Sequence, residues 1–143
     1  MKITGSQRTQ LIAYVEILKH LLHLDHWTID VTTDPGDDFD EGDAKNAEAG
    51  TLVRFEANVA TLYVPETLFQ QPPDRQRQTL LHEFMHMYLS HLMEDCDAVL
   101  RAHLHEPTYD AVKTLISREY ERTTDSLASA IAEHYPLPAL AKR

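Results

Sequence analysis

The feature that most constrains this chain is an apolar stretch interrupted by His82, Glu83 and His86 in the order His-Glu-x-x-His. The neighbouring positions 80, 81, 84, 85, 87 and 89 are all apolar, which predicts a helix buried on most of its sides. On such a helix His82 and His86 lie one turn apart, so their rings point toward one position. Burying these polar groups is unfavourable unless a partner compensates them, and a shared zinc ion does so. The pattern predicts a zinc site with Glu83 beside it as a general base.

The length and composition fit one domain over residues 1–143. With 43% hydrophobic and 25% charged residues, the sequence is typical of a globular protein with its own core. No apolar run is long enough to span a bilayer, and the first residues lack the apolar core of a signal peptide. The single cysteine, Cys96, excludes an internal disulfide and favours a reducing compartment. We therefore expect a cytoplasmic protein.

The charge distribution bears on partners. The formal net charge is −10, and acidic residues gather in residues 34–48 and 94–97, whereas nucleic-acid partners usually require a basic face. We expect a protein or peptide partner, with no nucleic acid and no membrane. The acidic spacing of residues 34–43 resembles a calcium loop, but Pro35 and Gly36 occupy positions where such a loop needs ligands, which argues against calcium.

Periodicity and breakers predict an α+β fold, with a small sheet of three or more strands packed on the motif helix and a C-terminal helix. The predicted helices cover residues 6–24 with Ser6 as N-cap, about 75–92 with Asp74 as N-cap, and 107–133 starting at Pro107; the predicted strands cover 27–32, 51–56 and 60–64. Residues 93–106 are partly helical in pattern.

A catalytic zinc ion takes three protein ligands and keeps one position for water, so the motif needs a third ligand. Glu121 and Asp125 lie one turn apart on the last predicted helix. Glu121 is the preferred ligand, because Asp125 could then accept a hydrogen bond from a liganding histidine. Three alternatives stay open at this point: Glu119, His103 and His105.

Residues 79–88 resemble the extended motif of zincin metallopeptidases, and Glu121-x-x-x-Asp125 resembles the gluzincin arrangement. Over about residues 51–138 the chain is similar to the compact ImmA/IrrE-type peptidases of phage and mobile-element origin. It departs from that pattern at Asp125, where the family usually has Asn, and in the 34 residues between His86 and Glu121, which is a longer interval. The metzincin pattern is absent, because positions 89 and 92 are both leucine.

The resemblance implies a zincin-like domain that hydrolyses peptide bonds, with zinc held by His82, His86 and Glu121 and with Asp125 in support. It also implies that the substrate pairs with the strand near residues 61–64. The alternative is a zincin-fold protein that binds zinc without catalysis, as an interaction module or inhibitor. Glu83 disfavours that alternative, since a structural site needs no base and normally closes with a fourth protein ligand. Three side chains are candidate donors to a developing oxyanion, although packing alone also explains them: Tyr109, Tyr120 and His134.

Overall fold

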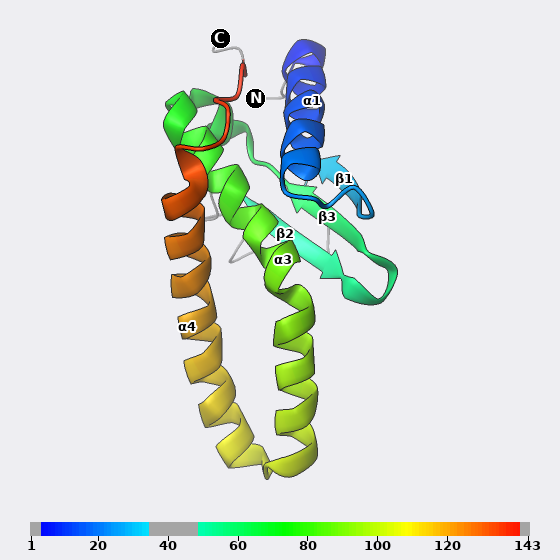
Figure 1. The fold of residues 1–143 in the computed structure, drawn as a ribbon, viewed down its shortest axis with the longest axis vertical. Coiled ribbons are helices and arrows are strands. Elements are labelled where there is room, and N and C mark those ends of the chain that lie inside the picture. Colours follow the sequence, from blue (N-terminus) through cyan, green and yellow to red (C-terminus); the bar gives the residue numbers. More distant parts are fainter. Residues whose placement is uncertain (1–3, 35–48, 141–143) are drawn as a thin grey trace.

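The computed structural model describes residues 4–34 and 49–140, and this part of the chain forms three α-helices and a three-stranded mixed sheet (Figure 1). The predicted α+β class is confirmed. The helices are α1 (Gly5–Leu21), α3 (Pro73–His103) and α4 (Glu106–Ala132), the strands are β1 (Thr28–Thr32), β2 (Gly50–Arg54) and β3 (Val59–Tyr63), and two short 3₁₀ helices are η1 (Phe55–Ala57) and η2 (Glu66–Gln70). The acidic segment considered for calcium lies outside the described residues except for Asp34.

The sheet has one face turned toward the core. β3 is central, with β1 parallel on one side and β2 antiparallel on the other. The register aligns two rows of side chains on that face: Ile29, Ala60 and Val53 in one row, and Val31, Leu62 and Thr51 in the next. Ala60 and Leu62 are fully buried and share a core with residues of α1 and α3. Both helices therefore cover the same face of the sheet.

The N-cap of helix α1 lies two residues before the predicted one. Thr4 is the N-cap, and its side chain accepts a hydrogen bond from the backbone N–H of Gln7 at 3.1 Å. The Gln7 side chain in turn accepts from the Thr4 backbone N–H at 2.9 Å, which completes a capping box. The prediction of Ser6 as N-cap is wrong because this reciprocal pair satisfies the helix end earlier.

Helix α3 is longer than predicted and begins at Pro73, with Pro72 as an N-cap that makes no side-chain hydrogen bond. Asp74 lies inside the first turn and pairs with Arg77 at 2.9 Å, so the prediction that it is the N-cap is wrong. The helix continues to His103 because residues 93–103 contain no proline or glycine. The whole uncertain segment up to residue 103 is therefore helical.

Helices α3 and α4 form an antiparallel hairpin whose turn projects beyond the sheet (Figure 1). Pro107 lies in the first turn of α4, as predicted. Near the turn, the Tyr109 hydroxyl donates to the Asp97 carboxylate at 2.6 Å, and the Lys113 ammonium lies 3.6 Å from the same carboxylate. The hairpin returns residues 120–128 to the side of the His-Glu-x-x-His segment. No helix in the described ranges combines the length and apolar character needed to cross a membrane.

Candidate metal centre

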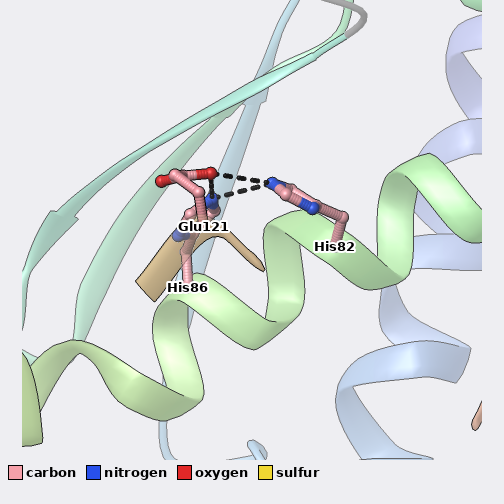
Figure 2. Close-up of side chains that lie close together, drawn as sticks. All are labelled: His82, His86 and Glu121. Carbon is pink, nitrogen blue, oxygen red and sulfur yellow. Dashed lines mark hydrogen bonds and ion pairs between the residues drawn. The ribbon is translucent and has the colours of Figure 1, made fainter. Parts of the chain in front are cut away.

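The hairpin brings His82, His86 and Glu121 together, and their ligand atoms all lie within 4.8 Å of one another (Figure 2). The Nε2 atoms of the two histidines are 3.0 Å apart. The Oε2 atom of Glu121 lies 3.6 Å from Nε2 of His82 and 3.7 Å from Nε2 of His86. This group could hold a metal ion.

The spacing of these atoms suits a tetrahedral ion. With bonds of about 2.0–2.1 Å, a tetrahedral zinc ion separates neighbouring ligand atoms by about 3.3–3.4 Å. The observed separations of 3.0, 3.6 and 3.7 Å lie on both sides of that value. The three separations depart from the tetrahedral value by about a few tenths of an ångström.

Small side chains let α4 approach α3 at this site. Thr124 and Ala128 are fully buried in the contact. Next to the site, the Tyr120 hydroxyl donates to the backbone carbonyl of His86 at 3.2 Å, and its ring centroid lies 5.2 Å from that of the His86 imidazole. Because Glu121 follows Tyr120 directly, this contact fixes the level at which the carboxylate meets the histidines.

Asp125 lies against His82, the kind of contact that the sequence analysis expects of a supporting carboxylate. Its Oδ1 atom lies 2.8 Å from Nδ1 of His82. An ionised carboxylate can only accept a hydrogen bond, so Nδ1 of His82 is the donor, and in the neutral imidazole Nε2 then keeps its lone pair. That lone pair faces His86 and Glu121. Metal binding through Nε2 requires this tautomer of His82.

Burial keeps His86 neutral. Its pKa is lowered to about 4, chiefly by desolvation and then by the neighbouring His82. Desolvation also raises the pKa of Glu121, while the nearby His82 opposes that shift. At neutral pH the site therefore offers a neutral His86 imidazole, as metal ligation demands.

Glu83 lies beside the metal-binding group and does not belong to it. Its side chain is buried, and its Oε2 atom accepts a hydrogen bond from the Thr51 hydroxyl at 2.8 Å. Burial raises the pKa of Glu83 to about 7, against the opposing effect of the Thr51 hydrogen bond. A carboxylate with a pKa close to neutral is well matched to taking up and releasing a proton.

The rival third ligands lie elsewhere. Glu119 faces another side of the hairpin, where it pairs with Arg118 and Arg122. His103 ends α3 and His105 is the N-cap of α4, so both lie at the hairpin turn. His103 is 17 positions past His86, which is about 25 Å along a helix.

Of the three candidate oxyanion donors, Tyr120 alone borders the site. Burial raises its pKa to about 12, so its hydroxyl stays protonated. Tyr109 donates to Asp97 in the hairpin, and His134 is exposed and lies 3.7 Å from Glu133.

The metal-binding group opens into a groove between β2 and the hairpin. A hollow of about 600 Å³ runs from His82 and His86 along α3 to Asp97 and Lys113. A second hollow of about 180 Å³ runs the other way, toward Arg75 near the start of α3. Both hollows are lined by Ala49, His82 and Glu83, so the groove passes the site on two sides.

The strand beside this groove is β2, not β3. Gly50, Thr51 and Val53 line the larger hollow, whereas β3 has strand partners on both edges. The expectation that a substrate pairs near residues 61–64 is therefore wrong. Both edges of that strand are already hydrogen-bonded within the sheet.

Thr51 is the site residue that the sequence analysis missed. A threonine in a strand is common, and nothing in its local pattern distinguishes it. The alternation of the strand places Thr51 on the same face as Val53, and this was the available signal that it faces the motif helix.

Comparison of the chain with known protein families, curated proteins and solved structures finds no match. The geometry of the site itself is therefore what points to a function.

Proposed function

We propose that this protein is a zinc-dependent metallopeptidase in which His82, His86 and Glu121 hold the zinc ion and Glu83 is the general base. The observation that carries the proposal is the convergence of three ligand atoms at the wall of a groove, with a buried carboxylate beside them. Among the described residues three side chains could bind the ion, and three protein ligands leave a coordination position for water, which distinguishes catalytic from structural zinc sites.

Zinc is the metal favoured by the donor set. Two imidazole nitrogens and one carboxylate oxygen, at distances that suit a tetrahedron, match zinc better than magnesium or calcium, which prefer oxygen ligands. The hydrogen bond from His82 to Asp125 is the support that such a ligand normally has.

The proposed reaction divides the work between the metal and Glu83. His82, His86 and Glu121 would hold the zinc ion, which when bound would lower the pKa of a water molecule and polarise the carbonyl of the scissile peptide bond. Glu83 accepts the proton of the attacking water and passes it to the leaving amine, so the carboxylate returns to its starting state. Thr51 occupies Oε2 of Glu83, which leaves Oε1 for the proton.

The proposed substrate is a peptide or protein segment in extended form. β2 is hydrogen-bonded to β3 along one edge, and its residues line the groove. An extended peptide can add to the other edge by β-augmentation. The net charge of −10 disfavours nucleic acid, and the single cysteine supports the cytoplasm as the compartment.

The test compares the wild type with Glu83→Gln at equal zinc loading. Glutamine keeps the size of the side chain and cannot take the proton, so zinc content and thermal unfolding should persist while cleavage of a broad peptide library falls by about 10²- to 10⁴-fold. Glu119→Gln is the matched control, because it makes the same change on the same hairpin away from the groove.

Equal cleavage by the wild type and Glu83→Gln would contradict the role of Glu83 as general base, whereas no cleavage by either zinc-loaded protein would favour the non-catalytic zinc-binding protein. Metal analysis provides a separate check on the ligands. If His82→Ala combined with His86→Ala still retains one zinc ion per chain, the proposed site is wrong.

A further inference from the structure

The general base of the proposed reaction is attached to the sheet by a single side chain. Thr51 Oγ1 donates to Oε2 of Glu83 at 2.8 Å, across the contact between β2 and α3. Glu83 is 5% exposed, so water has little access to replace that donor. In the described part of the chain no other side chain is seen to hydrogen-bond this carboxylate.

The conformation of the Glu83 carboxylate depends on such a partner. The terminal torsion of a glutamate side chain has a broad, roughly two-fold profile, so it sets no fixed plane for the two oxygens. A donor on Oε2 selects the plane and turns Oε1 toward the remaining open side. An error of about 1 Å in the position of a reacting group can cost about 10²-fold in rate.

Thr51 also belongs to the strand that borders the groove. β2 pairs with β3 through the register of Thr51 with Leu62, and Gly50, Thr51 and Val53 line the larger hollow. Within the described residues β2 has a strand partner on one edge, and a peptide that adds to its other edge would restrain the backbone of this strand. The restraint reaches Glu83 through the Thr51 hydroxyl.

We propose that Thr51 is a positioning residue that orients the Glu83 carboxylate and couples this orientation to the occupancy of β2 by substrate. The inference rests on the proposed peptidase function. Thr51 would touch neither the metal-binding atoms nor the scissile bond, and it would affect kcat through the orientation of Glu83.

The first experiment measures kcat and KM for zinc-loaded Thr51→Val, Thr51→Ser and Thr61→Val. Valine has the shape of threonine and lacks the donor, so kcat should fall about 10- to 100-fold with KM and zinc content nearly unchanged. Serine keeps the hydroxyl and should restore most of kcat. Thr61→Val is the matched control, because Thr61 lies on the opposite face of the sheet and its variant should behave as the wild type.

Peptide length tests the coupling. Lengthening a peptide so that it covers β2 should raise kcat in the wild type. In Thr51→Val the same lengthening should lower KM and leave kcat unchanged, because binding energy no longer reaches the base. An equal kcat gain in both proteins would overturn the coupling.

Crystal structures of the zinc-loaded wild type and both Thr51 variants provide a readout that needs no activity. The Glu83 carboxylate should leave its orientation in Thr51→Val and keep it in Thr51→Ser. An unmoved carboxylate in Thr51→Val overturns the inference even if the protein is a peptidase. A carboxylate that moves in a protein with no cleavage overturns the proposed function, and the role of Thr51 with it.

Discussion

Asp125 shows how one side chain decides what another can bind. Its carboxylate lies 2.8 Å from Nδ1 of His82 and so fixes the tautomer whose Nε2 faces the other ligands. Asp125→Ala removes this acceptor, and zinc affinity should fall about 10- to 100-fold, as for comparable supporting residues. Asp125→Asn retains an oxygen acceptor and should lose less. Competition titration with a zinc chelator measures the affinity of both Asp125 variants. Asp110→Ala is the control, because Asp110 is exposed on the same helix. Equal zinc affinity in the wild type and all three variants would refute the supporting role of Asp125.

The metal-free site carries opposing pH dependences, since burial lowers the pKa of His86 and raises the pKa of Glu83 and, in the same direction, of Glu121. Burial lowers the pKa of His86 from 6.5 to about 4, so stability from this group is lost as pH falls between those values. Burial raises the pKa of Glu83 from 4.5 to about 7, so stability from that group is lost as pH rises between those values. Over the pH range that His86 and Glu83 share, their contributions to the free energy of unfolding change with pH in opposite directions and offset one another.

Glu83→Gln should therefore reveal the pH dependence that His86 contributes to the free energy of unfolding. With chelator present, the free energy of unfolding of this variant should rise by up to about 3 kcal/mol from about pH 4 to pH 6.5, while that of the wild type changes less. Urea denaturation at several pH values measures the difference. Parallel pH profiles of the free energy of unfolding for the two proteins would show that Glu83 does not offset the pH dependence of His86.

At the scale of elements, α4 matters because it brings Glu121 to a helix that already carries two candidate ligands, His82 and His86. Glu121→Ala should weaken zinc binding by more than the roughly 100-fold that marks the upper range for supporting residues, since a ligand itself is lost. Glu119→Ala removes a carboxylate from the same helix on another face and should bind zinc as the wild type does. The reverse ranking in a zinc titration would reassign the third ligand to Glu119.

The elements also show which features the sequence could predict. The His-Glu-x-x-His spacing predicted one helix face, and the pairing of Glu121 with Asp125 predicted a second, because helical geometry converts spacing directly into direction. The order of strands in a sheet cannot be derived from residue spacing in the same way. The edge position of β2 depends on which strands pair, so the family resemblance wrongly implied pairing near residues 61–64, and the role of Thr51 was not predicted.

At the scale of the whole molecule, the groove extends past the site in both directions. Its larger arm follows α3 from His86 to Asp97, 11 positions or about 16 Å, which an extended peptide covers with about five residues. Its smaller arm reaches back from His82 to Arg75, 7 positions or about 10 Å, enough for about three residues. A substrate that fills both arms places its scissile bond in the interior of a chain.

This geometry predicts that neither end of the substrate has to be free. Peptides acetylated at the N-terminus and amidated at the C-terminus should be cleaved about as fast as the same peptides with free ends, because no terminal charge is needed to position them. Shortening a peptide below about eight residues should reduce kcat/KM as each arm loses contacts. Mass spectrometry of the products locates the cut, and Glu83→Gln at equal zinc loading excludes a contaminating protease. If cleavage requires a free terminus and releases residues one at a time from that end, one arm of the groove is closed to substrate, and the peptidase acts on chain ends while its metal site stands as proposed.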